Sequence, residues 1–176
     1  MALVLGGTAC NEALLPAPIN VNVVDTVSLF AIDGTPVASQ SGYSVVNGSP
    51  VRTDVTSSFD FLFNIDTLGR AVLIPASALH LVGNAGIQPL PATTVFANLR
   101  TAPGGFYITD TAVAVLPGDV LAVRSRLVNC DPLGNLYYYA KVGIIAIDAG
   151  ARRISFEILS NRNCGYRSLE PGKPTE

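Results

Sequence analysis

The alternation of apolar and polar residues with a period of two is the feature that most constrains how this chain folds. The clearest stretch alternates Phe59, Phe61, Phe63 and Ile65 with Ser58, Asp60, Leu62 and Asn64. A turn at 66–69 then leads into a second apolar run at 70–74. The pattern predicts a β-hairpin, because successive side chains of a strand point to opposite faces of a sheet.

Similar patterns recur along most of the chain. Residues 136–147 and 154–159 flank a polar turn at 148–153, which predicts a second hairpin. Further strands are predicted at 19–24, 27–32, 106–115 and 120–128. Only the segment 76–82, after Pro75, favours a helix. About ten short strands predict an all-β fold, a single β-sandwich of the jelly-roll or immunoglobulin-like kind with little or no helix.

Composition supports the same fold class. Charged residues make up 14% of the 176 residues, whereas apolar residues make up 49%, and the chain holds 16 glycines and 12 prolines. A globular domain usually carries about a quarter charged residues. The length predicts one domain with a sizeable core. No run of about 20 apolar residues predicts a membrane-spanning helix.

The N-terminal segment ends its apolar run at a cysteine. Residues 3–10 read Leu-Val-Leu-Gly-Gly-Thr-Ala-Cys. This segment resembles the signal of bacterial lipoproteins, in which the cysteine thiol receives a diacylglyceryl group and the chain is cleaved just before it. The resemblance implies a lipid anchor at Cys10. No Lys or Arg precedes the apolar run, whereas signals begin with a basic region, so we expect residues 1–9 to be the end of a longer signal.

This resemblance also divides the chain and implies its location. Residues 1–9 are the expected signal remnant, 10–18 the lipid anchor and a proline-containing tether, 19–168 the β-sandwich domain, and 169–176 a C-terminal tail. The protein is then expected outside the cytoplasm, anchored at the periplasmic face or in the outer membrane of a bacterium.

The cysteine count fits this location. Of the three cysteines, lipidation would occupy Cys10 and leave Cys130 and Cys164 as a candidate disulfide between two polar loops. Such a bridge would contribute about 3–4 kcal/mol in the chain-entropy model, and disulfides persist in oxidising compartments. Two free thiols are the alternative. The cysteine spacing does not match a zinc site.

Residues for catalysis are sparse. His80 is the only histidine, and no Gly-x-Ser-x-Gly segment is present. A hydrolase of the Ser–His–Asp kind needs a base with both a nucleophile and an orienting acid, so we predict no enzyme activity, cofactor or metal site. Most aspartates lie in turns, where they bond to their own backbone. Asp54 and Asp60 are less clearly turn residues. A pocket lined by Asp54, Asp60 or His80 would favour a protein that binds a small molecule or sugar.

The remaining polar residues predict contact surfaces. The net charge of −2 and the pI near 5.3 argue against nucleic-acid binding. Three consecutive tyrosines place rings on both faces of one strand, and four arginines follow toward the C-terminus. Because tyrosine and arginine are enriched at interface hot spots, we predict contact roles for Tyr137, Tyr138, Tyr139, Arg152, Arg153, Arg162 and Arg167.

Together these features predict a non-enzymatic, lipid-anchored, extracytoplasmic β-domain. Its expected role is that of a binding, scaffold or accessory subunit of a membrane or envelope complex, with membrane lipid and a partner protein as contacts. One alternative is a jelly roll that binds a small molecule or carbohydrate. Another is the subunit of a self-assembling surface filament, in which Cys10 forms an intermolecular disulfide.

Overall fold

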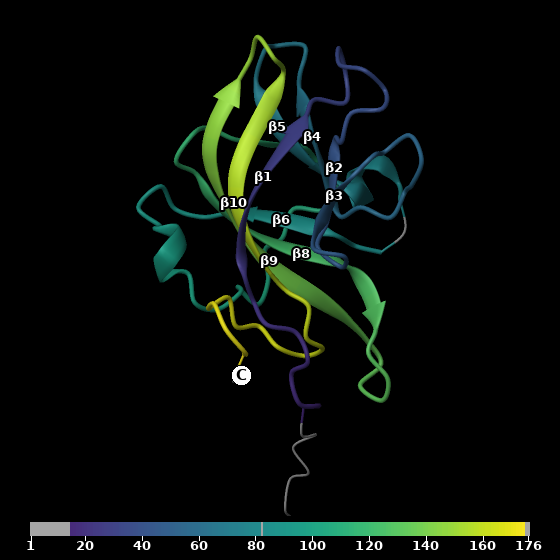
Figure 1. Cartoon of the computed structure of the whole chain (residues 1–176), viewed down its shortest axis with the longest axis vertical. Helices are drawn as coiled ribbons and strands as arrows, with labels where there is room; N and C mark the ends of the chain where they lie inside the picture. Colours follow the sequence, from purple (N-terminus) through teal and green to yellow (C-terminus); the bar gives the residue numbers. More distant parts are fainter. Residues whose placement is uncertain (1–14, 82, 175–176) are drawn as a thin grey trace, which may run out of the picture.

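Two antiparallel sheets form the framework of the protein (Figure 1). The computed structural model describes residues 15–81 and 83–174. Five strands form the first sheet in the order β1-β10-β9-β8-β6, and five form the second in the order β3-β2-β4-β5-β7. This confirms the predicted β-sandwich. The elements of the described chain are β1 (Val24–Phe30), β2 (Gly42–Ser44), β3 (Ser49–Val51), β4 (Phe61–Ile65), β5 (Ala71–Pro75), η1 (Ala76–Leu79), β6 (Gly86–Pro89), η2 (Phe96–Asn98), β7 (Val113–Ala114), β8 (Val120–Asn129), β9 (Asn135–Asp148) and β10 (Arg153–Asn161).

The hydrophobic core lies between the inner faces of the two sheets. At its centre, Tyr43 of β2 stacks on Phe61 of β4 with 5.5 Å between ring centroids. Phe156 of β10 lies 6.1 Å from each of these rings. All three side chains are buried. The aromatic contact therefore joins the first sheet to the second.

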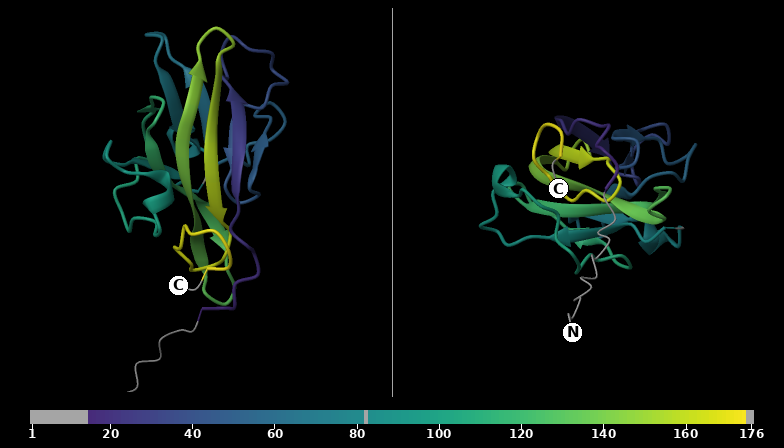
Figure 2. Two further views of the ribbon diagram at one scale, coloured as in Figure 1. Left: turned by 60° about the vertical axis from the view of Figure 1, so that its left-hand side comes forward. Right: turned by 90° about the horizontal axis from the view of Figure 1, so that it is seen from below.

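Both predicted hairpins are present. In the β4–β5 hairpin, the Asp66 carboxylate accepts hydrogen bonds from the backbone N–H groups of Leu68 and Arg70 at 2.9 and 2.8 Å. Gly69 completes this turn with a φ of +76°, a conformation that glycine adopts without strain. The β9–β10 hairpin pairs Asp148 with Arg153. It runs along most of the length of the molecule (Figure 2).

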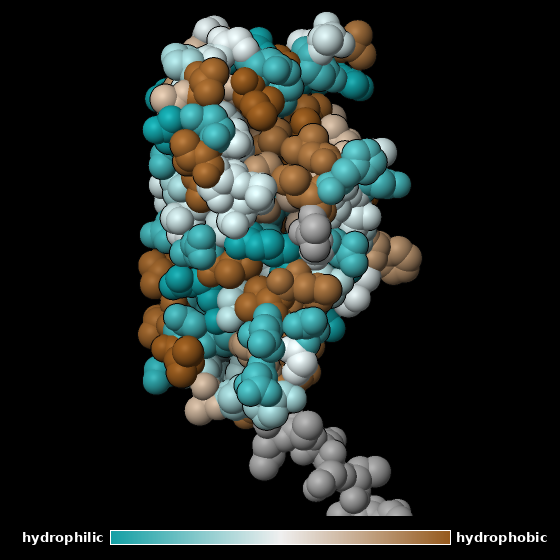
Figure 3. All heavy atoms as spheres, turned by 90° about the vertical axis from the view of Figure 1, so that its right-hand side faces the viewer, coloured by the Kyte–Doolittle hydropathy of each residue, from teal (hydrophilic) through white to brown (hydrophobic). Residues whose placement is uncertain are grey.

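A short helical segment follows Pro75, at the place where the sequence favours one. η1 is a single 3₁₀ turn that ends at His80, whose φ of +59° is left-handed. Neither 3₁₀ segment of the described chain approaches the length or apolar character that a membrane-crossing helix requires. The side of the molecule that lies at the right of Figure 1 shows hydrophobic patches interrupted by polar side chains (Figure 3).

The prediction of one strand over 106–115 is wrong. Ile108 forms a bridge with Ile87 of β6 in the first sheet, whereas Val113 pairs with Leu73 of β5 in the second. The segment therefore crosses from the edge of one sheet to the edge of the other. Phe106 has a φ of +65°, which an extended strand does not allow.

The alternation at 19–24 is oriented opposite to the expected half-buried strand. Val21 and Val23 are exposed, whereas Asn22 is buried. The backbone of Asn22 pairs with Gly172, with N–H···O distances of 2.8 and 2.9 Å in the two directions. The buried side of this segment thus faces the backbone around Gly172, and the two segments lie next to each other before the start of β1 (Figure 2).

Residues just beyond the expected start of the C-terminal tail, at residue 169, contact the rest of the described chain. Leu169 is fully buried in a cluster with Ala102 and Leu159, and Gly172 is paired as described above. At the other end, the Tyr166 hydroxyl donates a hydrogen bond to the carbonyl of Pro16, at 3.1 Å. The expected lipid attachment at Cys10 lies outside the described residues.

Candidate functional site

Tyrosine and arginine side chains from four segments meet on the outer face of the first sheet. β9 supplies Tyr137 and Tyr139, and β8 supplies Arg124, which lies opposite Tyr139 in the register. Tyr107 comes from the crossing segment, and Arg167 follows β10. We call these five half-buried residues the tyrosine–arginine ladder.

Successive members of the ladder are in contact. The Cζ of Arg124 lies 4.6 Å from the ring centroid of Tyr137 and 5.2 Å from that of Tyr107. The rings of Tyr107 and Tyr139 are 6.3 Å apart, and the Cζ of Arg167 is 6.0 Å from the Tyr139 ring. These distances fit cation–π and aromatic contacts, each worth about 0.5–1 kcal/mol at partly exposed sites.

Backbone carbonyls hold the polar ends of the ladder. Arg124 Nε donates to the carbonyl of Asn84 at 3.1 Å, and the Tyr107 hydroxyl donates to that of Pro103 at 3.1 Å. Arg167 Nη2 donates to the carbonyl of Ala102. Burial raises the pKa of the Tyr107 phenol, which therefore stays protonated at neutral pH. The ladder is thus held in place by hydrogen bonds to backbone carbonyls.

The approach of Tyr107 to the sheet depends on a glycine. A Cβ added to Gly86 would lie 2.8 Å from the Cβ of Tyr107 and 3.1 Å from Cγ2 of Thr109. Any side chain at position 86 would push the crossing segment away from β6. Gly86 therefore sets how closely Tyr107 packs against the sheet.

Phe106 stands beside the ladder with its side chain almost fully in solvent. It is 92% exposed, and its positive φ is unusual for a bulky residue. Left-handed backbone at a non-glycine residue costs about 1–3 kcal/mol, and such strain gathers at functional sites. The alternation of residue types over 106–115 instead predicts a strand that includes Phe106. The signal for a loop was the preceding Pro103-Gly104-Gly105.

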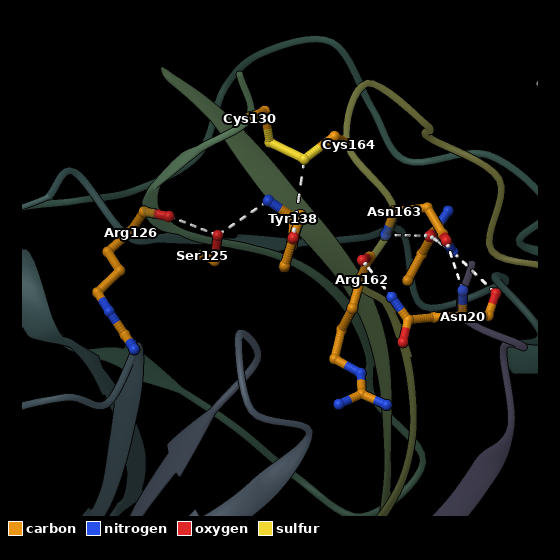
Figure 4. Close-up of a disulfide and its surroundings, with 9 residues drawn as sticks. Asn20, Ser125, Arg126, Cys130, Tyr138, Arg162, Asn163 and Cys164 are labelled. Atoms are coloured by element: carbon orange, nitrogen blue, oxygen red, sulfur yellow. Dashed lines mark hydrogen bonds between the residues drawn. A yellow bond between two sulfur atoms is a disulfide. The ribbon is translucent and has the colours of Figure 1, made fainter. Parts of the chain in front are cut away.

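Of the three consecutive tyrosines, Tyr138 does not join the ladder. Its side chain packs against the core on the opposite face of β9. Its hydroxyl lies 3.7 Å from Sγ of Cys164, and its backbone N–H donates to Ser125 Oγ at 2.9 Å (Figure 4). Tyr138 thus packs between the sheets. Its two neighbours lie on the outer face of the first sheet, where Tyr139 packs against the buried cluster of Ala102, Leu159 and Leu169.

The four C-terminal arginines do not form one surface. Arg152 donates to the carbonyls of Asp33 and Ile65 at the tip of the β9–β10 hairpin, where Arg153 is exposed. Arg162 lies at the other end of β10 and donates to the carbonyl of Asn47 at 3.1 Å. β10 separates the two groups by about 30 Å at the usual rise of a strand. Arg167 is the one arginine of the four that joins the ladder.

The predicted disulfide between Cys130 and Cys164 is present, with 5.7 Å between the Cα atoms (Figure 4). It joins the end of β8 to the segment that follows β10. In the same segment, Asn163 Oδ1 accepts hydrogen bonds from the backbone N–H groups of Ile19 and Asn20, both at 2.9 Å. A disulfide is typical of proteins that fold in an oxidising compartment.

The two aspartates singled out in the sequence have different surroundings. Asp60 is fully buried: its Oδ1 accepts from the backbone N–H and Nη1 of Arg126 at 2.6 and 3.2 Å, and its Oδ2 accepts from the Val45 N–H at 2.7 Å. Burial raises the pKa of the Asp60 carboxyl, and these donors oppose the rise. Asp54 instead forms an exposed pair with Arg52 at 2.6 Å. The two aspartates therefore do not lie in one common site.

His80 lines an open groove of about 540 Å³ together with Arg126 and the hydroxyls of Ser57 and Ser58. Within residues 15–81 and 83–174, no group of three His, Cys, Asp or Glu side chains is placed to share a metal ion.

Fold and surface together define the chain as a disulfide-bridged β-sandwich that displays a preorganised tyrosine–arginine ladder on one outer face. No family model, curated protein or solved structure matches it.

Proposed function

We propose that this protein is a non-enzymatic binding subunit of a membrane or envelope assembly. It works outside the cytoplasm of a bacterium, held to the membrane by lipid on Cys10. It engages a partner protein through the tyrosine–arginine ladder and Phe106. The observation that carries this proposal is the 92% exposure of Phe106 beside the ladder.

The chemistry of this face favours a protein partner. Exposed aromatic side chains commonly insert into a partner's pocket, and tyrosine and arginine dominate interface energetics. Arg124 and Arg167 lie within the same face and are held by backbone carbonyls, so docking them costs little side-chain entropy. The matching surface would offer an apolar pocket for Phe106 and carboxylates for the two arginines.

Two features of the chain support a location outside the cytoplasm at a membrane. The Cys130–Cys164 disulfide supports an oxidising compartment. The lipoprotein-like segment that ends at Cys10 supports anchoring. The disulfide-linked segment also contacts the chain near Pro16 and Asn20, so the folded domain begins within a few residues of the proposed anchor.

Photo-cross-linking in the native cells tests the binding role. A benzoyl-phenylalanine placed at Phe106 should capture a specific partner as a discrete band of higher mass. The matched control is the same probe at Leu68, which is 74% exposed on the β4–β5 turn, far from the ladder in sequence. The additional variant Arg124→Gln should remove the cross-link formed at position 106. Equal cross-linking at both positions, or none at 106, contradicts the proposal.

Intact mass of the protein purified from native membranes tests the anchor separately. We expect a chain that begins at Cys10 and carries an acylated glyceryl group. An unacylated chain that retains residues 1–9 contradicts anchoring and leaves the binding role to the cross-linking result.

A further inference from the structure

We infer that the protein has a second binding site, which takes a small organic molecule with a carboxylate. The site is the open groove of about 540 Å³ that His80 lines. We call it the Arg126 groove, and its principal lining residues are Ser57, Ser58, His80, Arg126, Leu127 and Asn135. Its volume lies within the range of about 300–1,000 Å³ typical of ligand sites.

A β-bulge directs Arg126 toward this groove. Arg124 and Arg126 would point to the same face of a regular strand, since side chains alternate with a period of two. The register between β8 and β9 shifts between Arg124 and Leu127. As a result, Arg124 joins the ladder on the outer face, whereas Arg126 reaches Asp60 beside the second sheet. Bulges are frequent next to functional sites because they redirect a side chain.

The guanidinium of Arg126 is fixed from its buried side. Its Nη1 pairs with Oδ1 of Asp60 at 3.2 Å and lies 3.5 Å from Oγ of Ser44. Asp60 is completely buried, whereas the Arg126 side chain is 20% exposed. Among the described residues, Nε and Nη2 of Arg126 donate to no acceptor. These donors are available to a ligand in the fork geometry that suits a carboxylate.

The rest of the groove matches the same ligand class. The serine hydroxyls, the Asn135 amide and the His80 imidazole offer hydrogen-bond donors, and Leu127 offers an exposed apolar surface. No acidic side chain is among the described residues that line the groove. Because Asp60 balances the charge of Arg126 from behind, the site suits one negative charge better than two. An organic monocarboxylate with an apolar body meets these conditions.

The groove and the proposed docking face are independent. Arg124 and Arg126 lie on opposite faces of β8, so ligand binding in the groove does not require the ladder. The inference therefore goes beyond the proposed function, and either one can fail without the other.

Nuclear magnetic resonance with benzoate as the probe tests the site in the full chain. Since the chain has one histidine, the imidazole signals of His80 are unambiguous reporters. We expect benzoate to shift these signals and the Nε–H signal of Arg126 saturably. Benzamide, which keeps the ring without the charge, should bind at least about tenfold more weakly, as expected when a charged hydrogen bond is lost. Absence of saturable shifts, equal binding of benzamide, or tighter binding of inorganic phosphate overturns the inference.

Variants locate the binding to the groove. Arg126→Lys keeps the charge opposite Asp60 but loses the fork, and should weaken benzoate binding at least about tenfold. Ser57→Trp fills the groove from an exposed loop position and keeps both members of the Arg126–Asp60 pair. This variant decides the matter if Arg126→Lys does not fold. The control Arg70→Lys alters another Arg–Asp pair, on the β4–β5 turn, and should leave binding unchanged. Unchanged affinity in Ser57→Trp overturns the assignment.

Discussion

At the scale of single residues, the buried Asp60 carboxylate holds together segments that lie far apart in the chain. Its carboxylate accepts hydrogen bonds from the backbone of Val45, Val46 and Arg126 and pairs with the Arg126 guanidinium. A buried carboxylate is tolerated only when its oxygens are satisfied in this way. Asp60 therefore connects the β2–β3 turn to the bulge in β8.

Replacing Asp60 with asparagine should lower the free energy of unfolding by about 3–5 kcal/mol, because it leaves the Arg126 guanidinium partly buried without its counter-charge. Urea denaturation measures the change. Asp54→Asn is the matched control, since it removes an exposed pair with Arg52 and should change stability far less. If Asp60→Asn lowered the free energy of unfolding as little as Asp54→Asn does, the buried pair would contribute little to stability.

At the scale of elements, the segment after β10 fastens both ends of the domain. The disulfide ties this segment to β8, Asn163 ties it to residues 19 and 20, and Gly172 pairs with Asn22. Leu169 adds a buried hydrophobic contact. The segment that leads into β1 and residues 162–172 thereby stabilise each other.

The double variant Cys130→Ala/Cys164→Ala should be less stable than the native protein by about 3–4 kcal/mol, because the unfolded chain regains the freedom of a loop of 34 residues. Thermal or urea unfolding measures the loss. Reductant should lower the stability of the native protein to a similar value and leave the double variant unchanged. A double variant as stable as the native protein would contradict this account.

At the scale of the whole molecule, the two sheets are joined by one large buried hydrophobic cluster, which includes three aromatic rings in mutual contact. Phe156 comes from the first sheet, and Tyr43 and Phe61 come from the second. Sheets that pack face to face are held by such interdigitated residues. Phe106, by contrast, is exposed and contributes nothing to this core.

Two substitutions of the same kind separate these roles. Phe156→Ala should lower the free energy of unfolding by about 3–5 kcal/mol through a cavity between the sheets. Phe106→Ala should change it by less than about 0.5 kcal/mol, as is usual for exposed positions, and should abolish partner binding. Calorimetry with a binding assay measures both. Loss of stability in Phe106→Ala would mean that this residue has a structural role instead.

The sequence by itself determined the fold class and the two hairpins, and it offered Cys130–Cys164 as a candidate disulfide once Cys10 was assigned to lipidation. Period-two alternation and turn residues act between neighbours in the chain, so local patterns carry this information. Only the tertiary structure decided that Asn22 is buried while Val21 is exposed. A pattern shows that the two faces of a segment differ, and the segments packed against it decide which face is covered.

The tyrosine–arginine ladder and the Arg126 groove could be found only in the tertiary structure. The ladder joins Tyr107, Arg124, Tyr139 and Arg167 from separate segments, and a bulge sends Arg126 to the opposite face from Arg124. The sequence indicated Tyr137, Tyr139 and Arg167 by residue type alone. Local patterns did not reveal these contacts, because they form between residues far apart in the chain and depend on sheet order, register and the crossing of residues 106–115.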